Sequence, residues 1–184
     1  MSIIALTVNT HALIPLIASI AYIPLFAILL LNRPWDRKQK SFFLFLIPAI
    51  LWSLGDFFFR SDFFIQDKIF IAEVVLCIMM WMLIQWHYFI SSFYRAQSIK
   101  IPLAYIFLLS TIALAALGYI PRGIEITPSG INVDYGIWII AIAFLFLFII
   151  AAKDMYSLAR RYKVLANPAE RNQFVYLFAA IAIL

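Results

Sequence analysis

Five long apolar segments, separated by short loops that hold most of the charge, are the feature that most limits what this chain can fold into. They cover residues 11–31, 41–59, 69–90, 101–120 and 137–158. Each contains about the 20 apolar residues that one helix needs to cross a bilayer. Of the 184 residues, 66% are apolar and only 12% are charged, whereas soluble domains carry about 25% charged residues. The sequence therefore predicts an all-α, polytopic transmembrane helix bundle that forms one domain over residues 1–184.

The distribution of basic residues predicts how this bundle lies in the membrane. Eleven of the 14 Lys and Arg residues fall in the first, third and fifth loops, and three fall in the second and fourth. Short loops on the cytoplasmic side are rich in Lys and Arg, so we expect the N-terminus outside. The net charge of +5 is spread over separate loops and forms no single basic face, which argues against a nucleic-acid partner.

Two local motifs predict where secondary structure begins. Asn167-Pro168-Ala169-Glu170 combines an N-cap, a first-turn proline and a capping glutamate, so a sixth helix is expected from about residue 168. That segment is still apolar at Leu184, and we expect the natural protein to continue beyond it. Residues 123–135 alternate apolar and polar side chains around Pro128-Ser129-Gly130, which predicts a short extracellular β-hairpin between helices four and five.

Three ionisable residues inside the predicted spans are candidates for function, because such groups are costly in a bilayer. Asp56 is followed at helical spacing by Arg60, so an intrahelical ion pair is favoured over a ligand site. Glu73 either extends its carboxylate to water or a neighbouring helix, or has a role in ligand binding or proton transfer. His87 is interpreted as a hydrogen-bonded residue in an interfacial aromatic belt, and this interpretation is favoured over a metal-binding or proton-transfer site.

Aromatic residues gather at the predicted outer end of the bundle, where an interfacial belt and an apolar ligand pocket would look alike. The predicted ligand-binding residues are Asp56, Glu73, Trp52, Tyr119 and Trp138.

Periodicity predicts which faces of the helices meet other helices. Met80, Ile84 and His87 continue a stripe from Glu73 along the third span, which is expected to face protein. Small residues that predict helix contacts are Ala49, Ser53, Ala104, Thr111, Ala115 and Gly118. Pro24 and Pro48 lie inside spans and are candidate bending points.

Nothing in the sequence predicts an enzyme. It contains no nucleophile motif, phosphate-binding loop or zinc-ligand spacing. The single cysteine, Cys77, excludes an intrachain disulfide and a multi-cysteine metal site. We therefore predict no catalytic residue, no metal and no cofactor.

From Phe42 to Leu184 the chain resembles the N-terminal seven-transmembrane sensor region of bacterial histidine kinases. The resemblance lies in Phe42-Phe43-Leu44, Leu51-Trp52-Ser53-Leu54-Gly55, residues 89–95, Tyr135-Gly136-Ile137-Trp138, and Asn167-Pro168-Ala169-Glu170-Arg171-Asn172-Gln173. It implies a multi-pass receptor in a bacterial plasma membrane. The seventh helix of such a receptor leads to a cytoplasmic output domain, through which two copies of the protein are expected to form a homodimer. This chain contains neither the seventh helix nor a kinase core.

Three functions compete on this evidence. The first is a membrane-embedded sensory module, in which an unknown small or apolar ligand, or a state of the lipid bilayer, stabilises one helix arrangement. The second is a small transporter or channel subunit, with Glu73 and His87 along a polar path. The third is a structural subunit of a membrane complex.

The predicted orientation has a direct test at the hairpin. A Ser129→Cys substitution in a Cys77→Ala background should react with a membrane-impermeant thiol reagent added outside intact cells. Labelling that occurs only when the reagent reaches the cytoplasm would show that the orientation is opposite to the predicted one.

Overall fold

The computed structural model describes residues 10–61, 63–94, 104–127, 130–165 and 167–183, and these are mostly helical. The α-helices are α1 (Thr10–Leu31), α2 (Arg37–Arg60), α3 (Lys68–Tyr94), α4 (Ala104–Ala116), α5 (Gly136–Phe146), α6 (Ala152–Val164) and α7 (Pro168–Ile183). A short 3-10 helix, η1 (Ile65–Asp67), precedes α3, and a π-helical turn, η2 (Leu147–Ala151), joins α5 to α6. Two antiparallel strands, β1 (Gly123–Thr127) and β2 (Gly130–Asp134), form the predicted hairpin.

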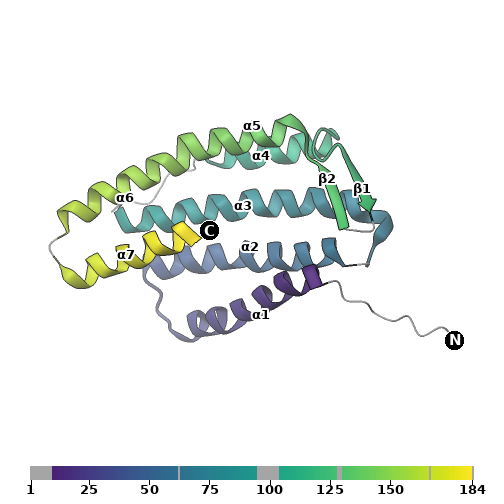
Figure 1. Cartoon of the computed structure of the whole chain (residues 1–184). Helices are drawn as coiled ribbons and strands as arrows, with labels where there is room; N and C mark the ends of the chain where they lie inside the picture. The colour runs from purple at the N-terminus through teal and green to yellow at the C-terminus, as the bar shows by residue number, and fades with distance from the viewer. Residues whose placement is uncertain (1–9, 62, 95–103, 128–129, 166, 184) are drawn as a thin grey trace.

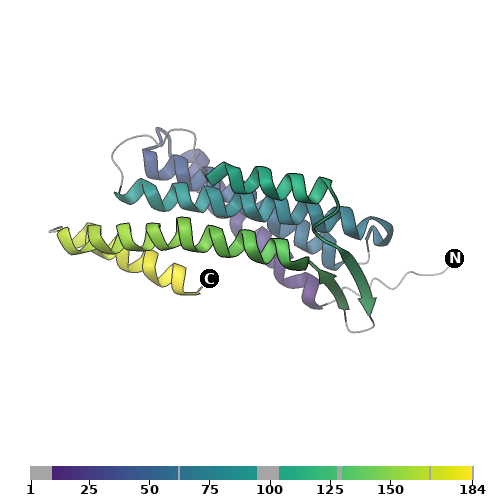
Figure 2. The ribbon, with the colours of Figure 1, turned by 90° about the horizontal axis from the view of Figure 1, so that it is seen from above.

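Helix α3 lies at the centre of the bundle. It packs against α2 on one side and against α4 and α6 on the other, while α1 contacts α2 and α7 contacts α6. Figures 1 and 2 show the hairpin at the end of the bundle where α2 turns into α3, and the connection from α6 to α7 at the opposite end. We call these the hairpin end and the basic end, because residues 160, 161, 163 and 171 around the α6–α7 connection are all Arg or Lys.

Four helical segments are long and apolar enough to cross a membrane, which identifies the chain as a membrane protein. They are Ala12–Leu31, Arg37–Arg60, Ile65–Phe93 and Gly136–Val164. Their outer faces are apolar and uncovered by protein: Ile14 of α1 and Ile140 of α5 are 68% and 63% exposed. Soluble monomers seldom expose such continuous apolar surface, so lipid is the solvent that suits it.

The fourth predicted segment, 101–120, is shorter as a helix than its apolar composition indicates. Helix α4 ends at Ala116, before the end of the predicted segment at residue 120. It ends because Gly118 adopts a left-handed φ of 72° and its N–H donates to the carbonyl of Ala115, while Tyr119 N–H donates to Leu114. Gly118 therefore terminates the helix, which corrects its prediction as a helix-packing residue. Residues 101–103 lie outside the described part.

The other small residues do mark helix contacts. Ala49, Ser53 and Thr111 are each 1% exposed or less, which confirms their prediction as packing positions. Gly55 permits a close approach of α2 to α3, because a Cβ at this position would lie 2.8 Å from Cγ2 of Val75. A larger residue there would force the two helices apart.

The ends of the other helices follow their local chemistry. Helix α2 begins at Arg37, before the predicted segment 41–59, because Asp36 and Gln39 form a reciprocal capping box. Helix α7 begins at Pro168, as the predicted cap requires. Helices α1 and α2 continue through Pro24 and Pro48.

Lys68 joins the two ends of the α2–α3 connection. Its side chain is buried, and its ammonium group donates to the carbonyl oxygens of Phe58 at 3.1 Å, Phe59 at 2.7 Å and Ser61. These carbonyls lie at the C-terminus of α2, where the helix dipole favours a positive charge. The lysine therefore satisfies backbone acceptors that an apolar side chain would leave without a donor.

Replacing this lysine should destabilise the bundle. We expect Lys68→Met to lower the free energy of unfolding by about 1.5–3 kcal/mol, because hydrogen bonds from a charged donor are lost. The measurement is unfolding of the detergent-solubilised chain by titration with sodium dodecyl sulfate. Lys40→Met, which removes an exposed lysine of α2, is the matched control and should change stability by less than about 0.5 kcal/mol. Equal losses in both variants would contradict this role.

Candidate functional site

A buried hydrogen bond between α3 and α6 is the most distinctive polar feature of the bundle. His87 Nδ1 lies 2.6 Å from Asp154 Oδ2, and the two side chains are 10% and 4% exposed. A carboxylate accepts hydrogen bonds, so Nδ1 is the donor when Asp154 is ionised. The distance is that of a short, charge-assisted hydrogen bond. The two residues are 67 positions apart in the sequence, so this contact ties two distant helices together.

The pair lies between two apolar clusters. Towards the hairpin end, Met80 and Ile84 of α3 pack with Phe146 of α5 and its neighbours. Towards the basic end, Ile90 packs with Leu158 of α6 and Phe174 of α7. A polar contact between two close-packed layers is sensitive to any sliding of α3 against α6, because a hydrogen bond of 2.6 Å weakens steeply as its distance and angle change.

The π-helical turn η2 directs Asp154 towards α3. The α3-facing side of the rod formed by α5, η2 and α6 carries buried residues at every fourth position: Ile142, Phe146, Ile150, Asp154 and Leu158. In an α-helix each four-residue step turns about 40° past a full turn, so residues spaced by four would gradually rotate away from α3. The wider turn over Leu147–Ala151 opposes that rotation. The unwinding therefore brings the carboxylate onto the same face as the apolar core.

A small cavity adjoins the pair. Its volume is about 60 Å³, and its lining includes His87, Asp154, Trp86 and Met155. This exceeds the roughly 10–15 Å³ needed for one water molecule. A water there would have polar partners on the pair, so the site has the size and the chemistry for proton exchange or for a hydrogen-bonded rearrangement.

Sequence analysis identified His87 and missed its partner. The hydrogen-bonded histidine favoured from the sequence is confirmed, and its partner is Asp154. A signal was present, because Asp154 lies inside the predicted span 137–158 and an acid there is costly unless it is paired. Nothing local shows that its side chain faces α3, because that depends on the π-helical turn.

Asp56 lies at the hairpin end, where the predicted ion pair is confirmed. Arg60 Nε donates to Asp56 Oδ2 at 2.9 Å, and the two side chains are 48% and 17% exposed. Tyr135, which precedes α5, is close enough to sense both charges. Burial raises the pKa of its phenol, Asp56 raises it further, and Arg60 opposes the shift. Asp56, Arg60 and Tyr135 therefore influence one another electrostatically at the hairpin end.

The remaining predicted ligand-binding residues are spread over three helices and one loop. Glu73 and Trp52 are partly buried, on α3 and α2, and no hydrogen bond or ion pair joins Glu73 to another described residue. Tyr119, after α4, and Trp138, on α5, are 50% and 46% exposed. Within the described ranges, no ring contact links Trp52, Tyr119 and Trp138. Their role in binding stays a prediction.

No group of three or more His, Cys, Asp or Glu side chains among the described residues is placed to hold a metal ion. Comparison with protein families, with curated protein sequences and with solved structures finds no match to this chain.

Breaking the buried pair should destabilise the bundle more than breaking the exposed one. We expect Asp154→Ala to lower the free energy of unfolding by about 1–3 kcal/mol, because His87 Nδ1 loses its acceptor in a buried place. Asp56→Ala is the control and should lower it by less than about 1 kcal/mol.

A double-mutant cycle in detergent with His87→Leu and Asp154→Leu isolates the contact itself. Coupling of about 0.5–3 kcal/mol is expected for residues in direct contact. Additive effects of the two substitutions would show that the pair contributes nothing of its own.

Proposed function

We propose that this chain is a membrane-embedded sensory module that transmits a signal, by way of a further helix that follows α7, to a cytoplasmic output domain. The observation that carries the proposal is the His87–Asp154 pair, a polar link between α3 and α6 inside an apolar bundle. A ligand or membrane state with different affinity for two helix arrangements would shift their populations. The pair is the contact that distinguishes such arrangements, because it is either made or broken.

The packing around α7 supports a path from the pair to the output side. Phe174 of α7 is buried against Ile90 of α3 and Leu158 of α6, four residues beyond Asp154. Its ring also meets Phe93 edge-on, with ring centroids 5.9 Å apart. Lys38 Nζ of α2 lies 3.4 Å from Gln173 Oε1 of α7. A shift of α6 against α3 would therefore change the surface on which α7 rests.

The proposed orientation has the N-terminus outside and the basic end in the cytoplasm of a bacterial cell, with the chain crossing the plasma membrane several times. The alternation of basic loops along the sequence supports it. The resemblance to histidine-kinase sensor regions adds the expectation of a homodimer formed through the output domain. In this proposal Asp56, Glu73, Trp52, Tyr119 and Trp138 belong to the outer, input half.

A transporter or channel subunit is the alternative, and the interior of the bundle favours it less. A polar path from Glu73 to His87 would run along α3 for about 21 Å. Met80 and Ile84 lie between them on the same face, and they are 1% and 0% exposed inside an apolar cluster. The described residues therefore offer a closed apolar core where a path would need water or polar side chains.

The test measures the position of α7 and solute flux in the same proteoliposomes. Nitroxide labels at Lys40→Cys on α2 and Val175→Cys on α7, in a Cys77→Ala background, report the distance between these helices by electron–electron resonance. We expect His87→Gln and Asp154→Asn to shift the distance distribution by about 2 Å or more, the scale of helix shifts in switching proteins. Flux of protons and potassium should stay at the level of protein-free vesicles.

Asp56→Asn is the matched control, because it removes an ion pair at the hairpin end without touching α6 or α7. Its distance distribution should equal that of the parent chain. An unchanged distribution in both pair variants would remove the pair from the signalling path. Flux above the protein-free level would favour the transporter.

A further inference from the structure

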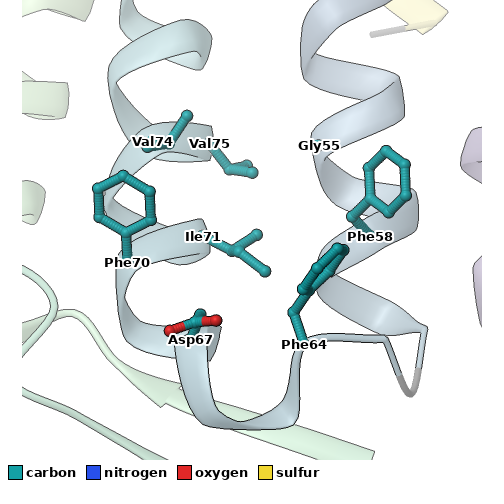
Figure 3. A pocket seen from close by; sticks show the side chains of 8 residues that line it. All are labelled: Gly55, Phe58, Phe64, Asp67, Phe70, Ile71, Val74 and Val75. Atoms are coloured by element: carbon teal, nitrogen blue, oxygen red, sulfur yellow. The ribbon is translucent and has the colours of Figure 1, made fainter.

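A second and larger cavity opens between α2 and α3 at the hairpin end. Its volume is about 490 Å³, within the range of sites that bind small molecules. Figure 3 shows Phe58 of α2 and Phe64 of the connection on one side, and Phe70 and Val74 of α3 on the other. None of the residues predicted to bind ligand lines it.

The walls of this cavity are apolar and face outward. Phe58, Phe64, Phe70 and Val74 are all exposed, from 39% for Val74 to 65% for Phe70. The opening therefore lies on the surface that lipid would cover, so an apolar molecule dissolved in the membrane could enter from the side. Gly55 of α2 and Val75 of α3 also line the cavity, where the two helices approach each other closely.

Phe64 is held in an unusual conformation at this cavity. Its φ of 57° lies in the left-handed region, which bulky residues rarely adopt. Its ring meets Phe58 edge-on, with centroids 6.3 Å apart. The two rings form an aromatic wall along one side of the opening.

Among the described residues that line the cavity, one is charged, the acidic Asp67 just before α3 (Figure 3). The two nearby cations are engaged elsewhere, because Arg60 donates to Asp56 and Lys68 donates to the carbonyls of α2. No ion pair joins Asp67 to a described cation. A ligand with an apolar body and a positive head would place its charge at Asp67 and its chain between the aromatic walls.

We propose that the α2–α3 cavity binds a single-chain amphiphile whose head is a protonated amine. Binding at this site stands apart from the sensory function; its role as the input ligand rests on that proposed function. An apolar body matches the walls of the cavity, and an ammonium head matches the charge of Asp67. A volume of about 490 Å³ suits one aliphatic chain. The aliphatic part supplies most of the affinity, since burial of apolar area is the larger contribution.

The test uses the whole chain in phosphatidylcholine nanodiscs with a dodecylamine probe that carries a photoreactive diazirine in its chain. Mass spectrometry locates the labelled residues and measures competition. We expect labelling at Phe70 and Val74, displaced about threefold better by dodecylamine than by dodecanoic acid, which is the scale of one exposed charge interaction. Asp67→Asn should abolish that preference and leave labelling in place. Glu125→Gln, at an exposed acid of the hairpin, should not change it.

A second pair of variants tests the cavity itself. Val74→Trp fills the space and should reduce labelling at Phe70 at least tenfold. Ile69→Trp places the same side chain on an exposed position of α3 that does not line the cavity, and should have no effect. Labelling that is spread over the lipid-facing helices, or that is unchanged in Val74→Trp, would overturn the proposal. Equal competition by amine and acid would overturn the assignment of the head group.

Two further arms separate the alternatives. Nanodiscs that contain phosphatidylethanolamine present the same ammonium group on a two-chain lipid. If this lipid displaces the probe as strongly as dodecylamine does, the proposal of a single-chain ligand is refuted. The distance between labels on Lys40→Cys and Val175→Cys is then measured with dodecylamine. A shift supports its role as the input ligand, and labelling without a shift refutes that role while the binding site stands.

Discussion

Close packing of α3 against α2 on one side and against the α5–η2–α6 rod on the other is the constraint on which this bundle depends. In lipid the hydrophobic effect does not press helices together, so tight contacts and hydrogen bonds between helices must do so. The approach at Gly55 supplies the first kind of contact. The hydrogen bonds from Gln85 to Tyr105 at 2.9 Å and between His87 and Asp154 at 2.6 Å supply the second.

Several buried polar groups form hydrogen bonds within a single helix or turn. Hydroxyl groups return to the backbone of their own helix, as Ser19 does to Pro15 and Thr111 does to Phe107. Lys68 bonds to the end of α2. Such bonds hold single helices or single turns, whereas the His87–Asp154 contact joins helices that approach each other only in the folded bundle. This difference is why a change at the pair would reposition whole helices.

The two cavities lie at opposite ends of this arrangement. The larger one is apolar, laterally open and next to the α2–α3 turn, while the smaller one adjoins the pair near the basic end. Helix α3 lines both, so it is the element through which the occupancy of one could affect the other. A rigid helix in a close-packed bundle transmits small shifts along its length, because its neighbours cannot deform independently.

The sequence by itself determined the features that depend on neighbouring residues: four of the five long apolar helices, the start of α7 at Pro168, the hairpin, and the Asp56–Arg60 pair. Apolar length, caps and four-residue spacing are local, so they can be read without a fold. Only the tertiary structure decided the end of α4 at a left-handed glycine, the partners of Lys68, the pairing of His87 with Asp154, and the cavity walls. Those contacts join residues distant in sequence, and their geometry depends on how close two helices approach and on one π-helical turn.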